Sequence, residues 1–127
     1  MPPSTPTADF TPAYLRIVAY WKDDLTVDFD FRTSAGATVN MTGTWSAAIY
    51  NEETDTTVIV TPTVVDTGEA TGDISMTVTT AQMATMFAGT TDTEWEGWYD
   101  LIRVDASSKR RTWVNGPFVV VRNRDIP

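Results

Sequence analysis

Apolar and polar residues alternate most regularly between residues 25 and 32. Leu25, Val27, Phe29 and Phe31 are separated by threonine, aspartate and arginine. Successive side chains of a β-strand point to opposite faces, so this pattern predicts a strand with one buried and one solvated face. A helix would distribute the same residues around its circumference.

Other segments rich in β-branched and aromatic residues predict further strands. We expect them over residues 14–20, 45–50, 57–65, 74–78, 95–105 and 112–122. The polar residues 51–55 are expected to close a hairpin between the second and third of these. Pro62 cannot donate to a strand ladder, which predicts an edge strand or a bulge there. Residues 106–111 are expected to join the last two strands in a terminal hairpin.

One segment changes to helical spacing. Residues 79–82 (TTAQ) fit a capping box, in which the Thr79 hydroxyl and the Gln82 amide each satisfy a backbone amide at a helix start. Met83, Met86 and Phe87 follow with the spacing of one helix face. We therefore predict a helix of about two turns that covers an end of the strands and ends near Gly89.

The order of these elements predicts an all-β fold. About seven strands, spaced roughly 8 to 12 residues apart, are typical of an immunoglobulin-like antiparallel β-sandwich, here with one short helix before the terminal hairpin. A length of 127 residues suits one domain. We expect a flexible proline-rich arm over residues 1–12, the sandwich over 13–124 and a short tail over 125–127.

Composition narrows the possible partners. The 9 basic and 17 acidic residues give a net charge of -8, which disfavours binding to a phosphate backbone. Residues 109–111 (KRR) could meet an acidic partner, although such a cluster is more often a solvated turn. No stretch approaches the roughly 20 apolar residues of a membrane helix, and residues 1–7 do not have the pattern of a signal peptide.

The sequence contains neither histidine nor cysteine. This excludes serine–histidine and cysteine–histidine nucleophiles, imidazole bases and the usual zinc sites. Pairs of acids, Asp28 with Asp30 or Glu94 with Glu96, could in principle serve a glycosidase, but alternating acids on a solvated strand face are a common solubility pattern. The acidic loops lack the spacing of a calcium loop. We expect no catalytic residues, no metal and no cofactor.

Exposed aromatic residues are the remaining candidates for binding. Among five tryptophans, Trp95 and Trp98 lie close together in a predicted strand with acidic neighbours. They could anchor a protein interface or stack on a sugar ring, and the alternative is that one or both pack into the core. We take Trp95, Trp98, Arg110, Arg111, Pro2 and Pro3 as candidate interface residues.

Seven short motifs follow one another over about residues 10–124. They are the alternating strand 25–31 (LTVDFDF), the turn 34–36 (SAG), 39–43 (VNMTG), 72–78 (GDISMTV), the helix start 80–83 (TAQM), 97–101 (GWYDL) and 116–120 (GPFVV). In the order of these motifs the sequence resembles a family of small bacteriophage virion domains, found at the amino end of baseplate upper proteins and in related tail or head appendages.

This resemblance implies a structural role. It suggests a non-enzymatic virion protein that forms homo-oligomers and docks to other virion proteins, and that is assembled in the host cytoplasm. Association would use exposed strand edges, the Trp95 and Trp98 side chains or the proline-rich arm. The alternative from another class is a carbohydrate-binding or adhesive module on the same kind of sandwich.

Overall fold

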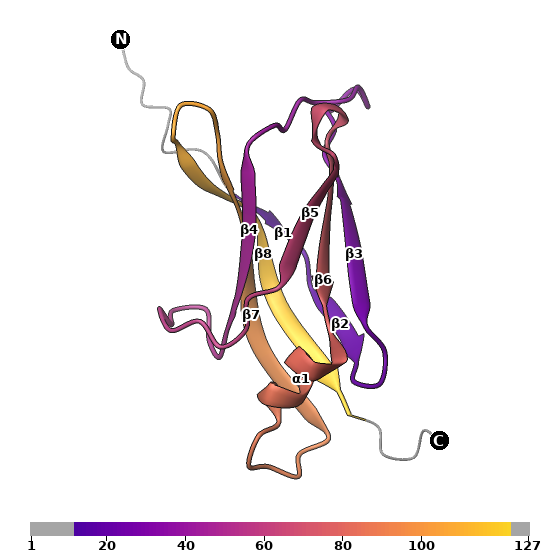
Figure 1. Ribbon diagram of the computed structural model, residues 1–127, viewed down its shortest axis with the longest axis vertical. Helices are drawn as coiled ribbons and strands as arrows, with labels where there is room; N and C mark the ends of the chain where they lie inside the picture. The colour runs from indigo at the N-terminus through magenta and orange to yellow at the C-terminus, as the bar shows by residue number, and fades with distance from the viewer. Residues whose placement is uncertain (1–11, 123–127) are drawn as a thin grey trace.

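The computed structural model describes residues 12–122, except for the side chain of Glu69, and it forms two packed β-sheets (Figure 1). The elements are β1 (Ala13–Tyr14), β2 (Ile17–Tyr20), β3 (Leu25–Asp30), β4 (Thr44–Tyr50), β5 (Thr63–Gly68), a 3-10 turn (Glu69–Thr71), β6 (Asp73–Val78), α1 (Thr80–Met86), β7 (Glu94–Val104) and β8 (Arg110–Val121). The predicted all-β sandwich with one short helix is confirmed.

The two sheets have the grouping of an immunoglobulin-like sandwich. One sheet has the order β3-β6-β5, and the other has the order β8-β7-β4 with β1 and β2 both paired to β8. In an immunoglobulin constant domain, strands B, E and D of one sheet correspond to β3, β6 and β5, and strands C, F and G of the other correspond to β4, β7 and β8. The first strand differs, because it joins the sheet of the last strand.

Two details of the predicted pairing are wrong. The sheets are not wholly antiparallel, because β1 and β2 run parallel to β8. Residues 45–50 and 57–65 do not form a hairpin either. β4 pairs with β7, while β5 pairs with β6 in the other sheet, so the chain crosses between sheets and keeps a single bridge from Ile49 to Val60. Alternation identifies strands, but it does not identify their neighbours.

The strand predicted over residues 57–65 begins later, because β5 starts at Thr63, directly after Pro62. β5 lies at the edge of its sheet, as predicted, but its register shift lies between Val65 and Gly68 and not at Pro62. β7 and β8 form the long terminal hairpin. Helix α1 has the predicted capping box. The backbone N–H of Gln82 donates to the Thr79 hydroxyl at 3.2 Å, and the backbone N–H of Thr79 donates to the side-chain oxygen of Gln82 at 3.0 Å.

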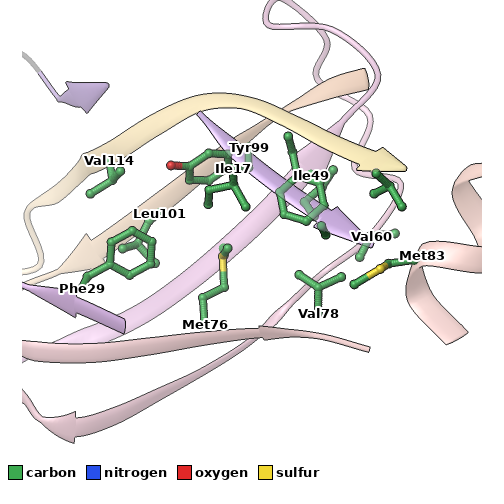
Figure 2. Packing of buried hydrophobic residues seen from close by; sticks show 14 of the residues in the cluster. Ile17, Phe29, Ile49, Val60, Met76, Val78, Met83, Tyr99, Leu101 and Val114 are labelled. Atoms are coloured by element: carbon green, nitrogen blue, oxygen red, sulfur yellow. The ribbon is translucent and has the colours of Figure 1, made fainter. Parts of the chain in front are cut away.

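The core fills the space between the sheets and beneath α1. Figure 2 shows Ile49, Tyr99 and Leu101 of the larger sheet facing Met76 and Val78 of the smaller one. Met83 of α1 is fully buried at one end of this layer. Burial of so many apolar side chains stabilises the sandwich without disulfides, in a chain that has no cysteine.

Candidate functional site

The two sheets differ in the surfaces that they turn away from the core. On the smaller sheet this surface is polar: the Thr26 and Thr77 hydroxyls lie 3.1 Å apart, and the Ser75 hydroxyl donates to Asp28 at 2.5 Å. These groups satisfy one another or face water. This is the ordinary solvated face of a half-buried sheet.

The corresponding surface of the larger sheet is rich in aromatic and aliphatic residues. We call this surface the outer face. Strand register assigns to it Tyr14, Val18, Tyr20, Tyr50, Glu94, Glu96, Trp98, Asp100, Arg110, Asn115, Pro117 and Val119. Tyr14 is 66% exposed, Tyr20 53% and Val18 37%. Large apolar side chains gathered on one exposed face are typical of a binding surface.

Trp98 and Tyr14 form the centre of the outer face. Their rings meet edge to face with centroids 6.3 Å apart. The Trp98 side chain also donates a hydrogen bond to Asp100, which lies one row further along β7. Burial of the Asp100 carboxyl raises its pKa, and this outweighs the lowering caused by Trp98 and by the Arg110 charge. A partly desolvated carboxylate therefore lies among aromatic rings.

The predicted interface residues are divided between opposite faces. Trp98 and Arg110 lie on the outer face, whereas Trp95 packs against the core from the other side of β7. Residues two apart share a face and residues three apart do not, so the two tryptophans do not form one patch. Arg111 is paired with Arg103 on the side opposite Arg110. Pro2 and Pro3 lie outside the described residues.

Trp95 has a specific place in the packing. A methyl group added to Gly97 would lie 2.2 Å from the Trp95 ring and 2.2 Å from the Tyr50 carbonyl oxygen. The indole thus lies over the glycine beside the edge of the core. The packing alternative applies to Trp95, while Trp98 is half-buried on the outer face.

The exposed residues of β1 and β2 were not among the predicted site residues. Residues 14–20 are recognisable as a strand, but the outer position of Tyr14, Val18 and Tyr20 follows only from their parallel pairing with β8. The available signal was the unusual apolar character of both strand faces. Such a pattern is typical of a strand covered on both sides.

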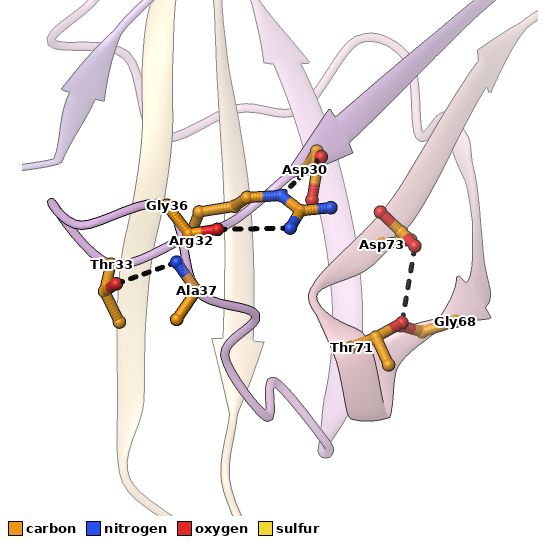
Figure 3. Close-up of polar contacts among 8 residues, drawn as sticks. All are labelled: Asp30, Arg32, Thr33, Gly36, Ala37, Gly68, Thr71 and Asp73. Atoms are coloured by element: carbon orange, nitrogen blue, oxygen red, sulfur yellow. Dashed lines mark hydrogen bonds and ion pairs between the residues drawn. The ribbon is translucent and has the colours of Figure 1, made fainter.

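The acid pairs considered for catalysis have ordinary surroundings. Asp30 forms an ion pair with Arg32 at 3.0 Å (Figure 3). In the adjacent turn the Arg32 side chain donates to the Gly36 carbonyl oxygen, and the Ala37 amide donates to the Thr33 hydroxyl. Glu94 and Glu96 are exposed on β7. Within residues 12–122, no group of three or more acidic side chains is arranged to hold a metal ion.

Two surface hollows are also poor in titratable groups. A hollow of about 450 Å³ lies between α1 and the segment before β5, lined by Ile59, Val60, Thr61, Ala81, Gln82 and Thr85. A second, of about 240 Å³, has Asp66 as its one titratable lining residue. Neither brings two carboxylates together. In the described part of the chain, no helix is long and apolar enough to cross a membrane.

The outer face is therefore the best-supported functional surface. No protein-family model matches the chain, and comparison with curated proteins finds no significant match.

Proposed function

We propose that this protein is a non-enzymatic structural component of a bacteriophage particle, in the tail, baseplate, neck or a head appendage. It acts by binding other copies of itself and other virion proteins. The observation that carries the proposal is the outer face, where Tyr14, Tyr20 and Trp98 are accessible beside a rigid strand ladder. Aromatic side chains dominate the binding energy of protein interfaces.

The phage context of the proposal comes from the order of motifs in the sequence. A virion part needs a rigid fold and a surface through which copies associate. The exposed aromatic outer face, set against a polar surface on the other sheet, suits such a part. The electrostatics of a chain with net charge -8 do not favour nucleic acid as its partner.

The test is quantitative mass spectrometry of purified particles of the phage that encodes the chain, with wild type and a Trp98→Ser variant supplied in turn. The proposal expects stoichiometric wild-type protein in particles and reduced incorporation of the variant. Thr26→Ser, on the polar face of the other sheet, is the matched control. Absence of the wild-type protein from intact particles would overturn the proposal.

A carbohydrate-binding module is the second candidate, and one observation favours it. Trp98 and Tyr14 flank the partly buried Asp100 carboxylate, and Asn115 is its partner on β8. An aromatic ring beside hydrogen-bonding side chains is suited to stack on a sugar and bind its hydroxyls. A glycan array separates the two candidates, because saturable binding that is lost in Trp98→Ala would support the module.

A further inference from the structure

The outer face carries opposite charges at its two ends. β7 begins with Glu94 and Glu96, whose side chains are exposed, and the opposite end of the hairpin carries Arg110. All three residues belong to the outer face by register, since Val104 pairs with Arg110 and Glu94 with Val121. At about 3.3 Å per residue, the acidic and basic ends lie roughly 30 Å apart.

The centre of the same face is aromatic, with the half-buried Asp100 carboxyl beside the rings. Between the charged ends lie Trp98 and Pro117 in one row, and Tyr14, Asn115 and Asp100 in the next. This gives the order acidic, aromatic, basic along the strands. Two copies of such a surface are complementary when they face each other across a two-fold axis that runs perpendicular to the strands, because the acidic end of each then meets the basic end of the other.

We infer that the outer face binds the outer face of a second copy of this chain, with β7 and β8 antiparallel to those of the partner and a two-fold axis near Trp98 and Asp100. This inference rests on the proposed self-assembly and specifies its geometry. This two-fold rotation places Glu94 and Glu96 of each copy opposite Arg110 of the other. A parallel arrangement would instead bring like charges together, which costs affinity.

The size of the face is sufficient for such a dimer. Four columns of strands about 4.8 Å apart and about 30 Å long give a footprint on the order of 600 Å² per copy, close to the ~800 Å² of a standard interface. Tyr14 and Trp98 supply the aromatic centre, and Val18 and Tyr20 extend the apolar surface along β2 into the rows of Glu96 and Glu94. An apolar centre with a charged rim is the usual anatomy of a stable interface.

Cysteine cross-linking tests the position of the axis, because the native chain has no cysteine. Asn115→Cys introduces one thiol beside the proposed axis, and Thr26→Cys introduces one on the polar face of the other sheet. With a short bismaleimide, Asn115→Cys should yield a covalent dimer and Thr26→Cys should remain monomeric. Equal cross-linking of both variants, or cross-linking of Thr26→Cys alone, would overturn the arrangement.

Charge reversal tests the antiparallel direction. Arg110→Glu and Glu94→Arg should each weaken the dimer about three- to tenfold, as expected for rim charges, and the double variant should recover most of the wild-type affinity. Sedimentation velocity measures the dissociation constants of the wild type and the three variants. A double variant that is weaker than either single variant contradicts the antiparallel arrangement.

The two experiments separate this inference from the proposed function. A wild-type protein that oligomerises but shows neither the Asn115→Cys dimer nor charge rescue overturns the antiparallel dimer and leaves self-assembly intact. A protein that is monomeric at every concentration, shows no cross-linking and is absent from purified particles overturns both.

Discussion

The Tyr99 hydroxyl donates a hydrogen bond to the Leu15 carbonyl oxygen at 2.8 Å, across a sequence separation of 84 residues. Tyr99 is fully buried in the core, and Leu15 lies between β1 and β2. Gly116 of β8 passes so close that a methyl group there would be 2.3 Å from the same oxygen. The core thus fixes the segment that supplies Tyr14 to the outer face.

Tyr99→Phe should destabilise the fold by about 1–2 kcal/mol, because it leaves the Leu15 carbonyl without this partner. Urea denaturation followed by tryptophan fluorescence measures the change. Amide hydrogen exchange in β1 and β2 should also become faster. Tyr20→Phe is the matched control: its ring is 53% exposed, so we expect a change within about 0.5 kcal/mol. Equal stability of Tyr99→Phe and wild type would show that the hydrogen bond does not hold this segment.

Gly97→Ala should destabilise the fold by about 1–3 kcal/mol or more, the usual effect of overpacking. The new methyl group would meet the Tyr50 carbonyl oxygen and the Trp95 ring, and the backbone oxygen cannot move away easily. Thermal unfolding measures the loss. Gly89→Asn is a suitable comparison, because a Cβ atom there meets nothing within 4 Å and asparagine tolerates the positive φ of 78°. If Gly97→Ala were the more stable of the two, this description of the packing would be wrong.

The capping box of α1 makes a separate prediction. Thr79→Ala removes the oxygen that accepts from the Gln82 amide and should cost about 1 kcal/mol, whereas Thr79→Ser keeps the oxygen and should cost far less. Chemical denaturation of the two variants gives the difference. Because Gln82 also donates to the Thr61 carbonyl at 2.9 Å, Gln82→Ala should cost more than Thr79→Ala. The reverse order would contradict the assigned contacts.

The Asp100 carboxyl predicts a pH dependence of stability. Burial raises its pKa above the ordinary value of 3.8, so the folded state keeps this proton to higher pH than the unfolded state does. The contribution of Asp100 to folding stability therefore falls as the pH rises from about 3.8 through the raised pKa. The difference in unfolding free energy between Asp100→Asn and wild type should grow in favour of the variant over this range. A difference that shrinks as the pH rises would contradict the assignment.

The sequence was sufficient for the local elements but not for the surface that they build. The 25–32 strand, the Thr79 capping box and the terminal hairpin follow from contacts between near neighbours, and periodicity reports these well. The parallel pairing of β1 and β2 with β8 depends on long-range contacts. Since that pairing decides which side of Tyr14 and Tyr20 faces solvent, the outer face could not be read from the sequence.

The tryptophans illustrate the same limit. Closeness in sequence suggested that Trp95 and Trp98 act together, yet the pleat of β7 places them on opposite faces. Strand alternation, applied strictly to the 95–98 spacing, would have separated them. By contrast, Arg110 and Arg111 point to opposite faces of the sheet only because β8 already begins at Arg110, within the segment predicted as the hairpin loop.

The most direct test of the outer face as an assembly surface is the molar mass of the purified protein, measured by multi-angle light scattering over a wide range of concentrations. We predict that the mass rises with concentration from the 14.0 kDa of one chain toward twice that value, and that Trp98→Ser stays near the monomer mass over the same range. A wild-type mass of 14.0 kDa at every concentration would contradict the claim.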